Sequence, residues 1–141
     1  MANNALLIYW DSSAILSALF ADTHSDKAKK WADETGLHFI STLAYAEVCA
    51  VIARMKREHI LAETLVNAAF EVLDQGPWRR IYTWPEWEIV RALSARWTLR
   101  GADLWHIAAA TTLRKKFPEL SFLTFNQRLK KAARGEALYN I

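Results

Sequence analysis

The sequence contains one cysteine, Cys49, which excludes an internal disulfide bond and a cysteine-rich zinc site. Because Cys49 lies in an apolar stretch, we expect it to be a buried structural thiol. Glycine and proline are also scarce, at 4 and 3 of 141 residues, which excludes a flexible low-complexity chain. No apolar run approaches the roughly 20 residues that a membrane-spanning helix needs. These absences indicate a compact globular protein.

The N-terminal stretch, residues 1–10, has no basic segment and too short an apolar run for a signal peptide. We therefore expect a cytoplasmic protein. The net charge of +3 permits an anionic partner without requiring one, because many ordinary domains carry as much. With 52% apolar and 23% charged residues, the chain has the composition of one domain that spans residues 1–141.

Short apolar runs alternate with helical patterns along the whole chain. Strands are predicted at residues 5–10, 37–40, 80–83 and 121–124, with a last edge strand at 137–141. Helices are predicted at residues 12–20, 26–35, 43–57, 60–73, 84–99, 102–117 and 126–134. Thr83 and Glu86 have the spacing of a capping box at the start of the fifth helix. The alternation predicts an α/β fold, a three-layer α/β/α sandwich with a mainly parallel central sheet.

Three acidic residues lie where such a sheet places its ligands, outside the carboxyl ends of the strands. Asp11 directly follows the first strand, and Asp103 opens a later helix. Glu47 lies in a helix that is apolar on nearly every face, so its carboxylate needs a distant partner or a metal ion. An oxygen-rich cluster of these three residues suits Mg²⁺ or Mn²⁺ rather than zinc.

Each acidic residue also has a structural explanation. Asp11 is a preferred helix N-cap, and Asp103 suits the positive end of a helix dipole. Glu47 can form a salt bridge with a residue from elsewhere in the fold. His106, three residues after Asp103, is better explained as a hydrogen-bonded helix residue than as a metal ligand. These alternatives stay open at this point.

Four segments, in order, resemble the motifs of the PIN-domain family. Ile8–Ile15 is similar to the opening motif, a strand that ends in Asp and is followed by Ser and a helix. Thr42–Val48 presents a Glu on a helix, and Gly101–Ala110 presents an Asp followed by a His and several alanines. Phe122–Leu129 resembles the last motif, a strand that ends in Thr. The order and spacing of the motifs cover essentially the whole chain.

The resemblance implies a PIN-like fold and endonucleolytic cleavage of RNA with Mg²⁺ or Mn²⁺ as the cofactor. The small single-domain form looks like a VapC-type toxin, the ribonuclease of a type II toxin–antitoxin pair. Such a toxin implies RNA as substrate, a cognate antitoxin as partner and a homodimer. We predict that Asp11, Glu47 and Asp103 hold one divalent metal ion, directly or through water, and that this ion activates the attacking water.

Asn126 departs from the family pattern, which commonly has a fourth carboxylate at this position. An amide oxygen can orient water but carries no charge, so a one-metal mechanism is the safer inference. Asn is also as good a helix N-cap as Asp. The alternative function is therefore a catalytically weakened PIN-fold module that binds nucleic acid or protein. A phosphatase-like enzyme fits less well, because the sequence has no Gly-rich phosphate loop, Asp-x-Asp pair or nucleophile elbow.

Other polar residues near the motifs are candidates for contacts with the substrate. The candidate substrate-orienting residues are Ser12, Thr124, Arg100 and Arg128. Further basic residues that could hold the RNA backbone are Arg96, Lys130, Lys131 and Arg134. A solvated helix face explains the basic residues equally well. Trp84, Trp87 and Trp97 are predicted to build a core or a dimer interface rather than to stack on bases.

Overall fold

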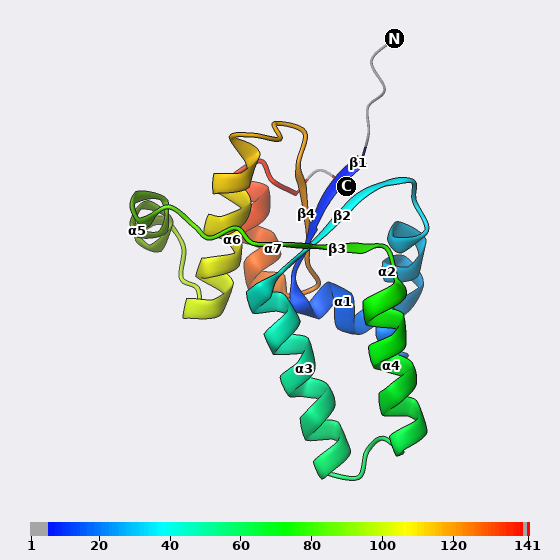
Figure 1. The fold of residues 1–141 in the computed structure, drawn as a ribbon. Coiled ribbons are helices and arrows are strands. Elements are labelled where there is room, and N and C mark those ends of the chain that lie inside the picture. Colours follow the sequence, from blue (N-terminus) through cyan, green and yellow to red (C-terminus); the bar gives the residue numbers. More distant parts are fainter. Residues whose placement is uncertain (1–5, 140) are drawn as a thin grey trace.

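The computed structural model describes residues 6–139 and 141, and in this part of the chain the strands form one four-stranded sheet (Figure 1). The strands lie in the order β3-β2-β1-β4, and each neighbouring pair is parallel. Their bounds are β1 Leu6–Trp10, β2 Gly36–Ser41, β3 Trp78–Ile81 and β4 Ser121–Leu123. Residue 5 of the first predicted strand lies outside the described residues.

Helices cover both faces of the sheet, and each face has its own apolar core (Figure 1). One face is covered by α1 (Ser12–Leu19), α2 (Ser25–Ala32), α3 (Thr42–Arg57) and α4 (Glu63–Gln75). The other face is covered by α5 (Trp87–Arg96), α6 (Gly101–Arg114) and α7 (Gln127–Gly135). The predicted three-layer α/β/α sandwich with a parallel sheet is confirmed. The described residues include no helix that is both long and apolar enough to cross a membrane.

Strand β1 is buried on both faces, which explains its continuous apolar run. Tyr9 points into one core, where its ring stacks on Phe122 at a centroid distance of 5.3 Å. Trp10 points into the other core and meets Trp78 edge to face at 5.4 Å. Successive residues of a strand face opposite sides of a sheet, so these two aromatic rings anchor both helical layers to the central strand.

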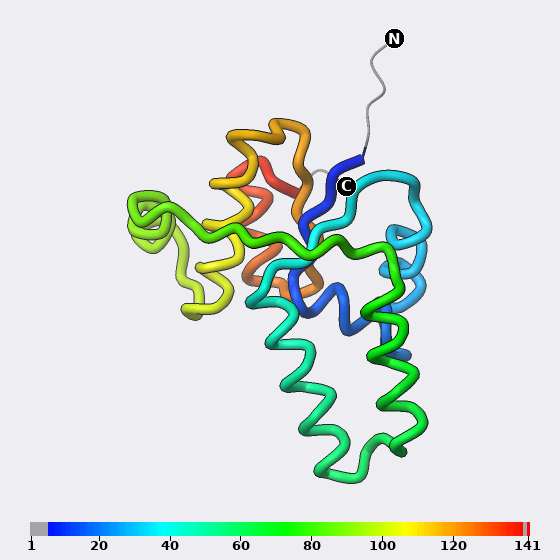
Figure 2. The backbone as a smooth tube through the Cα atoms, viewed as in Figure 1, coloured from blue at the N-terminus to red at the C-terminus, as the bar shows by residue number. Residues whose placement is uncertain are grey.

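The register of the central strands brings three distant segments to one edge of the sheet. Trp10, the last residue of β1, pairs with Ile40 of β2 and with Leu123 of β4. In Figure 2 the blue β1 accordingly runs beside the cyan β2 and the orange β4. The next residue of each chain segment therefore lies at the same carboxyl edge. These residues are Asp11, Ser41 and Thr124.

Two predictions around the third strand are wrong. Strand β3 spans Trp78–Ile81 rather than residues 80–83, because the buried side chain that anchors it is Trp78. The predicted capping box does not form, since α5 begins only at Trp87 and its N-cap, Glu86, makes no side-chain capping hydrogen bond. Instead the backbone N–H of Glu86 donates to Thr112 Oγ1 at 3.1 Å. A hydroxyl of α6 thus replaces the expected contact with Thr83.

The predicted last strand at 137–141 is also wrong for the residues that the structure describes there. Ala137 has a positive φ of 58°, which turns the chain after α7. Leu138 contacts the sheet through its carbonyl oxygen, which accepts a hydrogen bond from the Phe122 N–H at 2.8 Å. Residue 140 lies outside the described residues. Cys49 is partly exposed and not fully buried, because it lies at the edge of the α3 core face.

The tryptophans do not share one role. Trp84 and Trp87 are 74% and 89% exposed, so of the two predicted roles, a core or a dimer interface, the core is wrong for these two residues. Trp97 packs against Gly135 at the end of α7 and donates from Nε1 to Glu136 Oε2 at 2.9 Å. The exposed pair remains a candidate for contact with another molecule.

Candidate active site

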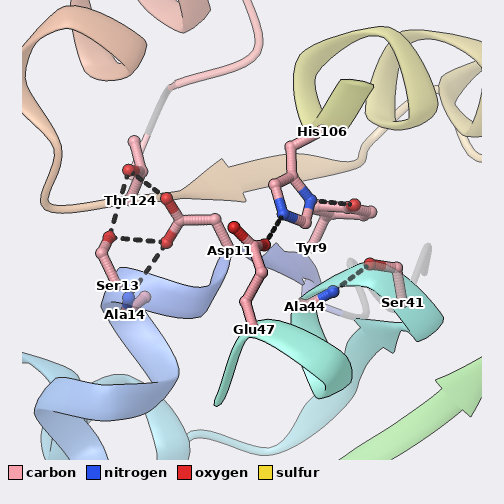
Figure 3. Close-up of polar contacts among 9 residues, drawn as sticks. All are labelled: Tyr9, Asp11, Ser13, Ala14, Ser41, Ala44, Glu47, His106 and Thr124. Atoms are coloured by element: carbon pink, nitrogen blue, oxygen red, sulfur yellow. Dashed lines mark hydrogen bonds and ion pairs between the residues drawn. The ribbon is translucent and has the colours of Figure 1, made fainter. Parts of the chain in front are cut away.

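Asp11 is both the N-cap of α1 and a buried carboxylate at the centre of a hydrogen-bond cluster (Figure 3). Its Oδ1 accepts from the Ala14 backbone N–H at 2.9 Å and from Ser13 Oγ at 2.7 Å. Its Oδ2 accepts from Thr124 Oγ1 at 2.6 Å. Burial raises the pKa of Asp11, although these three hydrogen bonds act to lower it. The capping role and a functional role therefore coexist in one side chain.

Glu47 finds the distant partner that its apolar helix predicted. Its Oε1 lies 2.5 Å from Nε2 of His106, a residue of α6 that is only 1% exposed (Figure 3). The other ring nitrogen of His106, Nδ1, lies 2.7 Å from the Tyr9 hydroxyl. His106 is thus a hydrogen-bonded helix residue, as its position suggested. It links the Glu47 carboxylate to Tyr9 of strand β1.

The Tyr9 hydroxyl is the buried end of this hydrogen-bond chain. Burial raises the pKa of Tyr9 far above its usual value, so the phenol keeps its proton. The hydrogen bond between Tyr9 and Ser41 lowers that pKa, as expected if the Ser41 hydroxyl donates to the phenol oxygen. The Tyr9 hydroxyl and the Glu47 carboxylate therefore engage both ring nitrogens of His106. These two contacts fix the orientation of the imidazole ring.

Asp103 lies in the first turn of α6 and is half-exposed. It lines a cavity of about 570 Å³ together with residues from α3 and from the starts of α6 and α7. The polar side chains of this cavity are Glu47, Arg100, Asp103, Asn126, Gln127 and Arg128. Burial raises the pKa of Asp103; His106 and Arg100 lower it, and the Glu47 carboxylate raises it further.

Asn126 caps α7, so the structural explanation of this residue is correct. Its side-chain oxygen accepts from the Leu129 backbone N–H at 3.1 Å. Its own backbone N–H donates to Thr124 Oγ1 at 3.1 Å. Asn126 also lines the same cavity as Glu47 and Asp103. As with Asp11, one side chain terminates a helix and faces the site.

The residues that could hold a metal ion gather around His106. It contacts Glu47 directly, and its charge acts on the carboxyl groups of Asp11 and Asp103. Carboxylate oxygens are the ligands that Mg²⁺ and Mn²⁺ prefer, so the donor set fits such an ion. Among the described residues, no three Asp, Glu, His or Cys side chains already converge as a complete metal site. Holding an ion therefore requires water-mediated contacts or a small movement of Glu47, which contacts His106 through Oε1 alone.

The substrate-orienting candidates fall into two groups. Arg100 and Arg128 are exposed and line the cavity, where they can contact a phosphate. Thr124 is fully buried and holds Asp11, so its contact is with the protein. Ser12 begins α1, whereas the neighbouring Ser13 bonds to Asp11 and accepts from the Phe125 backbone N–H at 3.0 Å. The sequence did not indicate a role for Ser13, because two adjacent serines after a strand give no signal of which side chain turns inward.

The PIN domain family matches residues 8–135, which is most of the chain. The chain belongs to the PIN domain family. Within this family it is similar to Ribonuclease VapC35 of Mycobacterium tuberculosis, in two strains, with 26% identity over 137 residues. The similar region covers 94% of this chain and 93% of that protein.

The fold of this PIN domain is similar to that of a solved structure. The crystal structure of Mycobacterium tuberculosis VapC20, described as a toxin that cleaves the sarcin-ricin loop, matches with a TM-score of 0.58. The match covers 89% of this chain and 94% of that one, at 14% sequence identity. At this identity the match supports the fold, and the arrangement of strands and helices around Asp11 belongs to the same architecture.

Proposed function

We propose that this protein is a single-domain, metal-dependent endoribonuclease that acts in the cytoplasm as the toxin of a type II toxin–antitoxin pair. The observation that carries the proposal is the 570 Å³ cavity. Among the residues that the structure describes, two carboxylates, two guanidinium groups and no other charged side chains line this cavity. They belong to Glu47, Asp103, Arg100 and Arg128. Carboxylates that bind a divalent cation beside arginines that bind phosphate suit a phosphodiester substrate.

In this proposal Asp11, Glu47 and Asp103 hold Mg²⁺ or Mn²⁺, directly or through water. The chemistry that such an ion supplies is activation of a water for attack and neutralisation of charge on the phosphate. The protein fixes two of the three carboxylates in advance: Thr124 and Ser13 hold Asp11, and His106 holds Glu47. Preorganised groups of this kind contribute to catalysis because they do not reorganise during the reaction.

Orientation of the RNA is assigned to residues at the mouth of the cavity. Arg100 and Arg128 present planar donors that match two phosphate oxygens at once. Asn126 and Ser12 are partly exposed at the starts of α7 and α1, where their polar groups can orient a water or a phosphate oxygen. Because Asn126 has no charge, one bound metal ion is the expected stoichiometry.

The comparisons support the chemical class of the substrate. Ribonuclease VapC35, which is similar over nearly its full length, carries ribonuclease in its name, and VapC20 is described as a toxin that cleaves the sarcin-ricin loop. The proposal extends this activity to the present chain. A cognate antitoxin and a second copy of the chain are the proposed protein partners, and the exposed Trp84 and Trp87 are candidates for the dimer contact.

The proposal is tested by cleavage of a structured RNA pool with Mg²⁺, Mn²⁺ or EDTA. Wild-type protein, purified free of any partner, is compared with Asp11→Asn, Asp103→Asn and the control Asp26→Asn. Asp26 is an exposed residue of α2, so its variant removes one charge without touching the site. We expect metal-dependent cleavage by the wild type and the control, and no detectable cleavage by the two site variants. Circular dichroism checks that every variant folds.

The second candidate function, a non-catalytic binding module, is favoured by Asn126 in place of the usual fourth carboxylate. It predicts that folded, partner-free protein binds RNA or a protein but cleaves nothing in any metal. Metal-dependent activity that persists in both Asp11→Asn and Asp103→Asn would contradict the assignment of the site. Cleavage or no cleavage by the wild-type protein therefore separates the enzyme from the binding module.

A further inference from the structure

A second cavity, of about 230 Å³, lies at the carboxyl ends of β2 and β3. It shares no lining residue with the 570 Å³ cavity that holds Glu47 and Asp103. Its polar and aromatic walls come from Ser41 and Tyr45 on one side and from Arg80 and Tyr82 on the other. None of the catalytic roles assigned above uses Tyr45, Arg80 or Tyr82.

The guanidinium group of Arg80 is held in place by its neighbours. Its Nη2 donates to Asp74 Oδ1 at 2.7 Å, and the Tyr45 hydroxyl donates to the same oxygen at 3.2 Å. The guanidinium carbon lies 4.9 Å from the centroid of the Tyr45 ring. One face of the planar guanidinium is therefore covered by an aromatic ring, while the Arg80 side chain as a whole stays 57% exposed.

Tyr82 adds an exposed aromatic ring to this arrangement. It follows the end of β3, and 79% of it is exposed. Ile40 and Ile81 supply apolar wall between the aromatic and charged groups. The cavity thus combines an open tyrosine ring, a fixed guanidinium plane and an apolar wall. Nucleobases use such planes, since single-stranded RNA stacks its bases on aromatic rings and on arginine.

The cavity lies close to the carboxylate cluster. Ser41, which lines it, occupies the same sheet edge as Asp11, because Ile40 pairs with Trp10 in the register of β1 and β2. Neighbouring strands are about 4.8 Å apart, so the β2–β3 edge lies roughly 5–10 Å from Asp11. A strand whose phosphate reaches the carboxylates can place a neighbouring base at this edge.

We propose that this cavity is a base-binding subsite that stacks an unpaired nucleobase of the RNA beside the scissile phosphate. Tyr82 and Arg80 provide the stacking planes, and Asp74 and Tyr45 position Arg80. The inference rests on the proposed ribonuclease function, because it assigns part of the same substrate. It implies that single-stranded or looped RNA is preferred to a continuous duplex, whose bases are already stacked.

The test measures RNA binding to the full chain, with Asp103→Asn in every sample to prevent cleavage. Two fluorescent probes are used, an unstructured oligouridylate and an abasic oligoribonucleotide of equal length and charge. The variants are Tyr82→Ala, Arg80→Ala and the conservative Tyr82→Phe. Arg79→Ala is the matched control, since Arg79 is an exposed neighbour in β3 whose side chain points to the opposite face.

We expect Tyr82→Ala to weaken binding of oligouridylate roughly 5- to 150-fold, the range measured for one stacked base. Arg80→Ala should weaken binding of oligouridylate as well, while Tyr82→Phe and Arg79→Ala should bind it within about threefold of the parent. The abasic probe has no base to stack, so Tyr82→Ala should bind it as well as the parent does.

Equal affinity of Tyr82→Ala and its parent for oligouridylate overturns the subsite. So does a Tyr82→Ala variant that keeps its RNA affinity but loses self-association, which would make this face a protein interface. A parent that binds neither probe overturns the proposed RNA substrate itself, so the two failures are distinct.

Discussion

His106 Nε2 lies 2.5 Å from Oε1 of Glu47, although the two residues are 59 positions apart in the chain. The imidazole is buried between that carboxylate and the Tyr9 hydroxyl, which lies 2.7 Å from Nδ1. A buried histidine with both nitrogens in use has little freedom to rotate. The orientation of Glu47 at the cavity wall is therefore determined by a residue of α6 and by a tyrosine of the central strand.

Replacing His106 with Ala should lower RNA cleavage about 10- to 100-fold, the range found when the partner of a metal-binding side chain is lost. The metal concentration that gives half-maximal cleavage should rise in the same variant, because Glu47 loses its fixed position. Steady-state cleavage over a series of Mg²⁺ concentrations measures both effects. An unchanged metal dependence would show that His106 supports only the fold.

Tyr9→Phe tests the same chain of hydrogen bonds with a smaller change. It removes one buried hydroxyl and leaves His106 Nδ1 without its donor, at a cost of about 1–3 kcal/mol in the free energy of unfolding. Cleavage should fall, although less than in His106→Ala, and the metal dependence should shift in the same direction. Tyr139→Phe is the control, because within the described part of the chain the Tyr139 hydroxyl makes only a long contact, with Lys27 at 3.5 Å.

Asn126→Asp should strengthen metal binding without disturbing the fold. Asp is as good an N-cap as Asn, so the contact with the Leu129 N–H is kept and the free energy of unfolding stays within about 0.5 kcal/mol. The added charge on the cavity wall should lower the metal concentration needed for half-maximal cleavage. Asn126→Ala separates the two roles, because it loses about 1 kcal/mol of capping and gains no charge. Equal metal dependence of cleavage in Asn126→Asp and the wild type would show that the side chain of residue 126 does not affect metal binding.

Arg128→Ala should weaken RNA binding at all sequences alike. Loss of one phosphate contact lowers the slope of log affinity against log salt by about 0.7–0.9. Binding titrations from low to moderate salt measure this slope, with Lys29→Ala on α2 as a control for the loss of one exposed cation. If both variants change the slope equally, Arg128 contributes general charge rather than a specific phosphate contact.

Glu136 should make the stability of the protein depend on pH below neutrality. The hydrogen bond from Arg96 lowers the pKa of Glu136, and the one from Trp97 lowers it further, despite partial burial. A carboxyl with a lowered pKa stabilises the fold above its unfolded pKa, about 4.3, and this contribution is lost as the pH falls through the folded pKa. Glu136→Gln should therefore cost about 1 kcal/mol at pH 7, and this cost should shrink as the pH falls below about 4.3.

Urea unfolding at a series of pH values, with the exposed Glu71→Gln as control, measures the effect of Glu136. If the free energy of unfolding differs between wild type and Glu136→Gln by the same amount from pH 7 to pH 3, the stabilising role of the Glu136 carboxylate is contradicted. The two hydrogen bonds from Arg96 and the one from the Trp97 indole all lose their carboxylate acceptor in this variant.

Periodicity and turn chemistry in the sequence predicted the layers of the fold, since a buried strand such as β1 is apolar throughout. They failed where a distant contact decided the local structure. Trp78 draws β3 toward the amino side of the predicted strand, and Thr112 of α6 replaces the expected cap at Glu86. The local sequence pattern reveals neither contact, because the partner residues lie far away in the sequence.

The candidate site shows the same division. Asp11, Glu47 and Asp103 were predicted from their positions at strand and helix ends, and the structure brings them around one histidine. The identity of that histidine's partners was not predictable, because helix periodicity gives the face on which a residue lies but not what lies opposite. The choice of Ser13 over Ser12 depends on the exact turn after β1, which the sequence leaves open.

The hydrogen bond from Thr124 to Asp11 joins residues 113 positions apart. Thr124 directly follows strand β4, whose last residue, Leu123, accepts from the Asp11 backbone N–H through its carbonyl oxygen at 3.2 Å. A protein chain emerges from the ribosome with its N-terminus first. Until Leu123 and Thr124 have been synthesised, Asp11 therefore lacks these partners across the sheet. Assembly of the acidic cluster thus comes late in synthesis of the domain, and the ribonuclease activity proposed above can appear only after that step.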